Sequence, residues 1–345
     1  MRYNERIRLA GALISDAMLA EVLAEVLDAG ADLGPSFFEV TIAAAFLAFS
    51  RTPADVCVVE VGMGGRFDAT NVLEPEVLAA CGIAALGLDH ERFLLAPEEG
   101  TPLEPMARIA FEKAGIAKRG VTLVSFGHTA LERGSITAQA ERAGTAPLFE
   151  GDAWHFTARD DRLAYADGMG TLDLPAPALP GAHQAANASL AIAMLRHQSR
   201  IAVSEEAIAT GLAHAQWPAR MQRLQPGPLT GSREVWLDGG HNPQAGAMLG
   251  AHFAGQRLHL VIGMIEGKDP AALTGPLAPA LASITAVPVP GHDWHPPQAF
   301  GPAARAAPDL TAAMAMIPAD GLPVLIAGSL YLAGEVLRLN DEAPD

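Results

Sequence analysis

The chain has 345 residues, which exceeds one ordinary domain and suits two. Half of the residues are hydrophobic and 18% are charged, a composition that supports large buried cores and argues against disorder. The formal net charge of −16 repels nucleic acid and anionic membrane surfaces, so we expect neither as a partner.

Cysteine usage and hydropathy bear on the compartment. Cys57 and Cys81 both lie in apolar runs, and we expect them to be buried, reduced thiols. No apolar run reaches the length of a membrane span, and the first residues lack the layout of a signal peptide. We therefore expect a soluble, cytoplasmic protein.

The first half of the chain alternates predicted helices and strands. Ser15 can cap a helix that ends near Gly30, and a second helix is expected over 37–49. The apolar runs 56–61 and 78–86 predict strands buried on both faces of a parallel sheet. A helix over 105–116, a strand over 121–125 and a helix over 129–143 follow. This alternation is typical of a doubly wound α/β fold.

The second half opens with a change of pattern. Residues 153–174 alternate polar and apolar residues and predict a small antiparallel hairpin, followed by helices over 183–198 and 204–214. The Pro/Gly-rich stretch 225–228 is the best candidate for a domain boundary. Strands are expected at 235–237, 258–262, 284–289 and 324–326. We therefore expect one domain over 1–225 and a smaller α/β domain over 229–345.

Three motifs of the first domain stand where predicted elements end. The segment EVGMGGRFDATN, residues 60–71, follows a strand at the position where open α/β sheets bind ligands, although a tight turn with a surface Glu60 explains the glycines equally well. His90 ends the next strand and could hold Mg²⁺ together with Glu60, although a structural histidine is the commoner case. In FEKAGI, Lys113 ends a helix, where stabilising the helix dipole is the simpler role.

Further motifs gain meaning from their order along the chain. LPGAHQAAN (179–187), WPAR (217–220) and LDGGHNP (237–243) could each be capping and turn chemistry. Preceded by SFFE (36–39) and the three motifs above, and followed by GSLY (328–331), they resemble the signature series of the folylpolyglutamate synthase/dihydrofolate synthase branch of the Mur ligase family. The resemblance runs from about residue 3 to residue 338.

The resemblance implies a fold and a set of residue roles. The fold is a Mur-ligase-like, P-loop-type ATPase domain followed by a smaller, Rossmann-like C-terminal domain that completes the glutamate ligase. Lys113 matches a lysine that is carbamylated in relatives, and a carbamate is the anionic oxygen donor for Mg²⁺ that an ammonium cannot be. The other matched residues are Glu60 and His90 for Mg²⁺; Asn187, Arg220 and Asp238 for ATP; Ser36, Phe37, Phe38, Glu39, Phe67, Asp68 and Ala69 for the pteroate; and His241, with Lys113, for catalysis.

The implied reaction is an ATP-dependent ligation. The family adds L-glutamate to dihydropteroate or folate through an acyl phosphate, and metal ions with Arg220 would offset the charge of the phosphoryl group. The implied partners are these small molecules together with ATP and Mg²⁺, and a monomer is expected at full length. Neither the balance between the two synthase activities nor the polyglutamate length can be inferred from the residues.

One family feature is missing from the 345 residues. Relatives carry a P-loop and a Ser-Pro-His-Leu segment near their N-terminus, yet the pattern G-x-x-x-x-G-K-S/T does not occur here, and Gly267-Lys268 is followed by Asp. We therefore expect an N-terminally incomplete ATPase domain with little ATP-dependent activity. Two alternatives remain: a non-catalytic product that binds folate or a partner, and another Mur-type ligase. The acidic, Pro-rich loop 95–102 is longer than usual, and we expect it to be exposed.

Overall fold

The structure, a computed structural model, describes residues 3–88 and 91–343. The chain divides into two compact units. The N-terminal unit comprises Arg6–Pro177 and Gln184–His214, and the C-terminal unit comprises Ala178–His183 and Ala215–Asp345 with the first residues of the chain. This division falls at Ala215, upstream of the 225–228 stretch that the sequence suggested.

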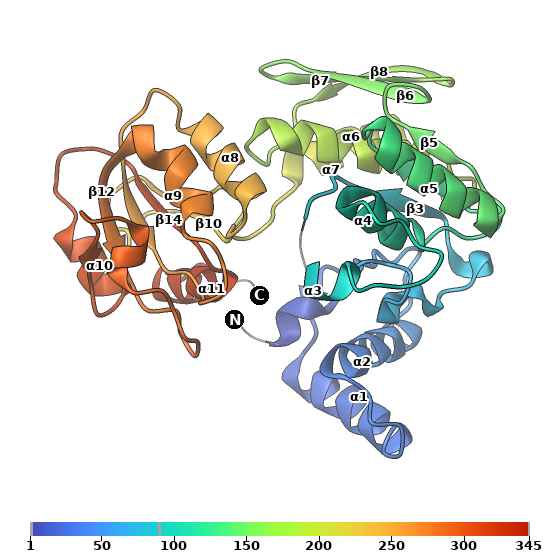
Figure 1. The fold of residues 1–345 in the computed structure, drawn as a ribbon, viewed down its shortest axis with the longest axis horizontal. Coiled ribbons are helices and arrows are strands. Elements are labelled where there is room, and N and C mark those ends of the chain that lie inside the picture. Colours follow the sequence, from blue (N-terminus) through green and yellow to red (C-terminus); the bar gives the residue numbers. More distant parts are fainter. Residues whose placement is uncertain (1–2, 89–90, 344–345) are drawn as a thin grey trace. The chain divides into compact units, whose positions relative to one another are not determined.

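The chain begins with a 3-10 turn, most of which belongs to the C-terminal unit, and the N-terminal unit then opens with a short hairpin and a pair of packed helices (Figure 1). The helix α1 starts after Ser15, whose hydroxyl accepts a hydrogen bond from the Met18 amide at 3.2 Å, and it ends at Gly30, as predicted. The helix α2 confirms the second prediction. The bounds are Tyr3–Arg6 for the turn, Arg8–Leu9 (β1), Ala12–Leu13 (β2), Asp16–Ala29 (α1) and Phe37–Arg51 (α2).

A three-stranded parallel sheet with the order β3-β4-β5 follows, and the helices α4 and α5 pack against each other beside it. Its core joins Ile83, Leu123, Ile136 and Phe149 from strands and helices. The predicted strand over 121–125 and the helices over 105–116 and 129–143 are confirmed, whereas the strand predicted over 78–86 is limited to Ala80–Ile83 and only Ile83 in it is buried. The bounds are Ala80–Ile83 (β3), Thr122–Ser125 (β4), Pro147–Phe149 (β5), Glu91–Leu94 (α3), Pro105–Ala114 (α4) and Ala130–Ala143 (α5), with 3-10 turns at Ala69–Val72 and Pro75–Val77.

The predicted buried strand over 56–61 is wrong. In the described chain this segment pairs with no strand, and the side chain of Val58 is 91% exposed. An apolar run is buried only where a neighbouring element covers it, and no described strand does so here. The prediction of two buried cysteines fails with it, because Cys57 is exposed while Cys81 is half-buried.

Residues 153–174 form the predicted antiparallel structure, with three strands in the order β6-β7-β8. A core of Trp154, Leu163, Tyr165 and Ile192 joins this sheet to the helix α6, and α7 contributes Ile208. The bounds are Trp154–Ala158 (β6), Arg162–Asp167 (β7), Gly170–Pro175 (β8), Ala182–Arg196 (α6) and Glu205–His214 (α7).

The C-terminal unit is a six-stranded sheet in the order β13-β12-β11-β14-β10-β9, parallel except for β9. The helices α8 and α9 cover one face and α10 and α11 the other (Figure 1). The predicted strands are confirmed, although β12 begins and ends earlier than expected. The bounds are Gln222–Arg223 (β9), Val235–Asp238 (β10), Leu258–Ile262 (β11), Leu281–Ala286 (β12), Arg305–Ala306 (β13), Val324–Ala327 (β14), Pro243–His252 (α8), Ala271–Leu277 (α9), Leu310–Met316 (α10) and Leu330–Leu339 (α11), with 3-10 turns at Ala278–Ala280 and Pro297–Phe300.

A membrane-spanning helix needs about 20 consecutive apolar residues. Across the described residues, none of the helices combines the length and the apolar composition needed to cross a membrane.

Candidate functional site

The glycine-rich segment 62–71 packs directly on the end of α4. The Arg66 amide donates to the Glu112 carbonyl at 2.9 Å. A Cβ on Gly65 would stand 2.9 Å from the Lys113 carbonyl oxygen, and one on Gly115 would stand 2.5 Å from the Cα of Arg66. The two backbones therefore approach so closely that only glycine fits at both contacts.

The guanidinium of Arg66 belongs to a network of ion pairs. It contacts the buried carboxylate of Glu112 at 2.9 and 3.0 Å and also the carboxylate of Glu98. Arg108 shares Glu112 at 2.8 Å, and the two acids raise the pKa of Arg66 above its ordinary value, Glu98 most strongly. Glu98 lies in the 95–102 loop, which is largely exposed as predicted, so this network ties the loop to α4.

Asp68, a predicted substrate residue, holds the shape of the same segment. Its buried carboxylate accepts hydrogen bonds from the Met63 amide at 2.7 Å and from the amide and hydroxyl of Thr70 at 3.0 and 2.6 Å. Asn71 donates to the carbonyls of Arg66 and Gly115, each at 3.1 Å. The segment is therefore rigid, and Ala69 opens the 3-10 turn that Asp68 caps.

The predicted pteroate-binding aromatics lie close to this segment. The side chains of Phe37 and Phe67 are 62% and 80% exposed. A Cβ on Gly62 would overlap the ring of Phe38, so the start of α2 rests on the glycine segment. Exposed rings beside a rigid backbone suit a flat heteroaromatic ligand.

Ser36 and Glu39, two further predicted pteroate residues, form a capping box. The Ser36 amide donates to the Glu39 carboxylate at 2.7 Å, and the Glu39 amide donates to the Ser36 hydroxyl at 3.3 Å. Both residues are exposed, and the hydrogen bonds with Ser36 lower the pKa of Glu39. Their visible role is to start the helix that carries Phe37 and Phe38.

Two of the three predicted metal ligands lie within the described residues. Glu60 is exposed and precedes the glycine turn, Lys113 is half-buried in the last turn of α4, and His90 lies outside the described residues. Within the part of the chain that the structure describes, no group of three or more His, Cys, Asp or Glu side chains could hold a metal ion. The metal set therefore stays a prediction.

In the C-terminal unit, two predicted ATP residues come together where β10 ends. The buried carboxylate of Asp238 accepts from the Met221 amide at 2.9 Å and from the Gly240 amide at 2.7 Å. Met221 and Ala219 have left-handed φ values of 45° and 56°, a conformation that costs energy without glycine. Asp238 thus holds a strained turn, with Arg220 at its centre.

The strained turn places Arg220 beside a glycine loop and a helix N-terminus. One guanidinium nitrogen of Arg220 lies 3.5 Å from where a Cβ on Gly239 would stand. Asn242 caps α8 by accepting from the Ala245 amide at 2.9 Å, and the Nδ1 atom of His241 lies 3.1 Å from the Gly239 carbonyl oxygen. A strand, a glycine turn and a helix N-terminus form the arrangement at which α/β sheets bind anionic ligands.

The sequence reasoning passed over His183, which belongs to the same unit. Burial lowers the pKa of His183, and Asp238 and Arg220 act on it in opposite directions, so the three side chains lie within electrostatic reach of one another. Its Nδ1 atom is buried without a hydrogen-bond partner. The available signal was its place in the LPGAHQAAN motif, four residues before Asn187. Asn187 lies exposed on α6 of the N-terminal unit and donates to the Gln184 side chain at 3.2 Å.

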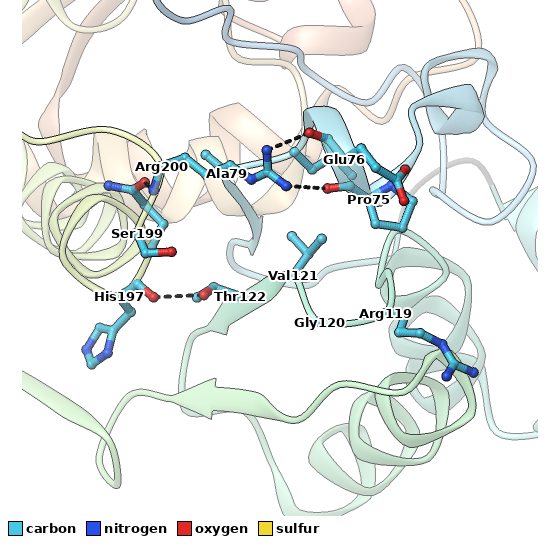
Figure 2. A pocket seen from close by; sticks show the side chains of 12 residues that line it. Pro75, Glu76, Ala79, Arg119, Gly120, Val121, Thr122, His197, Ser199 and Arg200 are labelled. Atoms are coloured by element: carbon cyan, nitrogen blue, oxygen red, sulfur yellow. Dashed lines mark hydrogen bonds between the residues drawn. The ribbon is translucent and has the colours of Figure 1, made fainter.

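A polar pocket of about 290 Å³ in the N-terminal unit contains none of the predicted site residues (Figure 2). Arg200 donates to the carbonyls of Glu76 and Pro75 at 2.5 and 3.2 Å, and the Thr122 hydroxyl donates to the His197 carbonyl at 2.8 Å. The Thr122 bond ties the start of β4 to the loop after α6, and the Arg200 bonds tie the same loop to the 3-10 turn Pro75–Val77, which is a structural role.

Comparison with known proteins identifies relatives over nearly the whole chain. No protein-family model matches it. The folylpolyglutamate synthase of Lacticaseibacillus casei is 31% identical over 97% of this chain and 80% of its own length, and the dihydrofolate synthase/folylpolyglutamate synthase of Escherichia coli is 30% identical over 99% and 78%. The chain spans 41% of a probable bifunctional folylpolyglutamate synthase/dihydropteroate synthase of Haloferax volcanii, at 32% identity.

Solved structures agree with these relatives and confirm the predicted fold class. The Escherichia coli FolC structure in complex with DHPP and ADP matches with a TM-score of 0.84 and 29% identity, over 99% of this chain and 80% of that one. A Yersinia pestis bifunctional folylpolyglutamate synthase/dihydrofolate synthase complexed with AMPPNP and Mn ion matches with a TM-score of 0.81 and 27% identity, over 98% and 79%. The chain therefore belongs to the folylpolyglutamate synthase/dihydrofolate synthase family of ATP-dependent ligases.

Proposed function

We propose that this protein adds L-glutamate to the carboxylate of dihydropteroate, folate or both, using ATP. Family membership supports the reaction type. The observation that carries the assignment to this chain's own residues is the strained turn at Arg220, which Asp238 holds against the glycine loop and the N-terminus of α8. Such a turn presents a fixed cation and backbone amides to an anionic group.

The proposed chemistry activates a carboxylate. The γ-phosphoryl group of ATP passes to a carboxylate oxygen of the pteroate, which gives an acyl phosphate and ADP. The amine of L-glutamate then attacks the acyl carbon, and inorganic phosphate leaves with that oxygen as the amide bond forms. Phosphate is a far better leaving group than oxide, which explains why ATP is consumed. Arg220 offsets the negative charge of the transferring group.

The remaining roles are proposals from the family resemblance. When bound, Mg²⁺ would offset the charge of the nucleotide phosphates, with Glu60, His90 and carbamylated Lys113 as its protein ligands. Asn187 would contact the nucleotide. The exposed rings of Phe67, within the 62–71 segment, and of Phe37, next to the Phe38 that packs on this segment, support the proposed pteroate site.

We further propose that these 345 residues by themselves turn ATP over slowly. The sequence contains no G-x-x-x-x-G-K-S/T pattern to cradle the phosphates, and about a fifth of each solved relative has no counterpart in it. Among the described residues, the run 56–61 pairs with no strand and its Val58 is 91% exposed, which suits a sheet that lacks one neighbouring strand.

A phosphate-release assay tests both proposals. Dihydropteroate, L-glutamate and Mg²⁺-ATP are supplied to the 345-residue chain and to the same chain extended by the codons upstream of Met1. Glutamate-dependent phosphate release by the extended chain, reduced at least about a hundredfold by Arg220→Gln, is the expected result. Strong turnover by the 345-residue chain would refute the slow-turnover proposal alone. Absence of turnover from an extended chain that contains a P-loop would refute the ligase proposal.

A second candidate function is non-catalytic binding of folate or a partner. The exposure of Val58 and its neighbours in the 56–61 run favours it, because apolar patches of this kind mark association sites. Calorimetry with dihydropteroate distinguishes this candidate from the ligase. Non-catalytic binding requires that the 345 residues bind the pteroate without turnover, and that the upstream reading frame encodes no P-loop.

A further inference from the structure

A second pocket lies at the opposite end of the C-terminal sheet from the Arg220 turn. It has a volume of about 500 Å³, within the range of small-molecule sites. It surrounds the first residues of β11 and β12, whereas Asp238 and Gly239 stand where β10 ends. Its lining residues are Arg257, His259, Ala282, Ser283, Thr285, Arg305, Met316, Pro318, Asp320 and Leu322.

The pocket floor is polar where a buried parallel sheet is normally apolar. On the face covered by α10 and α11, β11 carries His259 and then Val261, and the parallel register sets His259 beside Ser283 and Val261 beside Thr285. The polar residues occupy the beginning of the strands, and the valine lies farther on, inside the core. Burying a histidine and two alcohols in a sheet costs free energy unless they are bonded.

Hydrogen bonds fix the imidazole of His259 in this floor. Its side chain is 3% exposed, Nε2 lies 3.2 Å from both oxygens of Asp320, and Nδ1 lies 2.7 Å from the Ser283 hydroxyl. Hydrogen bonds from the Leu322 amide and from His259 lower the pKa of Asp320, so this carboxylate is ionised at neutral pH. Since a carboxylate only accepts, Nε2 carries a proton and the ring is held in one orientation.

Two arginines complete the pocket wall. Arg257, just before β11, and Arg305, on β13, are both exposed, and no hydrogen bond or ion pair joins the guanidinium group of either one to another described residue. Among the described lining residues Asp320 is the sole acid, and it already bonds His259. Two unpaired guanidinium groups in one hollow are notable in a chain with a net charge of −16. Guanidinium geometry matches phosphate and carboxylate oxygens.

We propose that this pocket binds a small organic anion, with a phosphate or carboxylate head on Arg257 and Arg305. The wall formed by Ala282, Met316, Pro318 and Leu322 takes the apolar body of the ligand. His259 holds the Ser283 hydroxyl in place at the pocket floor. The site is separate from the Arg220 turn and does not depend on the ligase activity.

Calorimetric titration of the complete chain with phenyl phosphate, benzoate and inorganic phosphate tests the proposal. Because the apolar wall contributes, phenyl phosphate or benzoate should bind more tightly than inorganic phosphate. Whichever of these two aromatic ligands binds more tightly identifies the preferred head group, phosphate or carboxylate. Arg257→Gln and Arg305→Gln each weaken that binding about tenfold or more, and the double variant abolishes it. These side chains are exposed, so the variants should keep the unfolding midpoint of the parent.

Three further variants serve as controls. Arg338→Gln removes the same charge from an exposed position on α11 and leaves the affinity unchanged. Asp320→Asn keeps an oxygen on the pocket rim but removes the acid, and it tightens binding about fivefold, the size of one charge interaction near a surface. Unchanged affinity in the double variant, loss of affinity in Arg220→Gln instead, or the absence of binding by all three anions at millimolar concentration would each overturn the proposal.

Discussion

A Cβ placed on Gly115 would stand 2.5 Å from the Cα of Arg66, closer than two carbon atoms can pack. Gly115 lies just after α4, and Arg66 lies in the glycine-rich segment. The sequence motifs EVGMGGRFDATN and FEKAGI are therefore one packed unit in space. Their joint occurrence has a physical cause, because each backbone fits only if the other carries glycine at the contact.

Gly115→Ala should destabilise the N-terminal unit by about 1–3 kcal/mol, the usual cost of overpacking. Gly115 has a helical φ of −61°, so the added methyl group acts through the contact and not through backbone strain. Gly134→Ala is the matched control, since Gly134 lies inside α5 with open space at its Cβ and should gain about 0.5–1 kcal/mol. Urea unfolding followed by circular dichroism measures both. Equal effects from the two substitutions would contradict the packing account.

Local signals were sufficient for most of the fold. The ends of α1 were predicted from Ser15 and Gly30, because helix capping depends on nearby residues. The sheet within 153–174 was predicted from alternating polar and apolar residues, because its strands are neighbours along the chain. Val58 shows the limit, since an apolar pattern does not reveal whether another element covers the run, and no described strand does so. The division at Ala215 could not be predicted from the sequence either, because contacts between residues define it and no Pro/Gly-rich stretch marks it.

Asp238→Ala should lower both stability and nucleotide affinity. The substitution leaves the amides of Met221 and Gly240 without their acceptor, which costs about 1–3 kcal/mol, and it releases the strained turn around Arg220. Fluorescent ADP binding, read beside thermal unfolding of the same samples, separates the two effects. Asp309→Ala, which removes the exposed N-cap of α10, is the control: it costs about 1 kcal/mol and should keep the affinity. Parallel losses of affinity in both variants would argue against a role for the turn.

The buried ion pair of Asp167 with Arg196 should make the free energy of unfolding fall in acid. The hydrogen bonds from Arg196, at 2.7 and 2.8 Å, lower the pKa of this fully buried carboxylate below its unfolded value of about 3.9. Its contribution is therefore complete above the unfolded pKa and is lost as pH falls through the lower folded pKa. The unfolding midpoint of the parent should fall more steeply below about pH 4 than that of Asp167→Asn.

The exposed Asp173, which pairs with Arg162, provides the control for this effect. Arg162 also lowers the pKa of Asp173, but solvent screens an exposed pair, so Asp173→Asn should leave the acid limb of the pH profile nearly unchanged. If Asp167→Asn has the same acid limb as the parent, the carboxylate of Asp167 does not contribute as described.

The two cysteines should differ in reactivity. Burial raises the pKa of Cys81 to about 11, whereas Cys57 lies exposed in the unpaired 56–61 run. Because the thiolate is the reactive form, iodoacetamide at pH 8 should modify Cys57 at least about tenfold faster than Cys81. Mass spectrometry of the parent, Cys57→Ser and Cys81→Ser assigns the two rates. Protection of Cys57 would show that another surface covers the 56–61 run.

The site was only partly readable from residues. Arg220 and Asp238 were found from motif order, and the structure brings them together. His183 was missed because its proximity to Arg220 and Asp238 arises from the fold and not from spacing. The hydrogen bonds of Asp68 and Ser36 likewise became visible only with coordinates, because a motif does not distinguish a side chain that shapes a loop from one that touches a ligand.

The formation of an acyl phosphate is the central chemical claim, and isotope transfer tests it most directly. Dihydropteroate labelled with ¹⁸O in its carboxylate is incubated with L-glutamate and Mg²⁺-ATP and either the 345-residue chain or, if that chain is inactive, the chain extended upstream. The mechanism predicts one ¹⁸O atom in each inorganic phosphate released with the glutamate adduct. Formation of that adduct with unlabelled phosphate would contradict it.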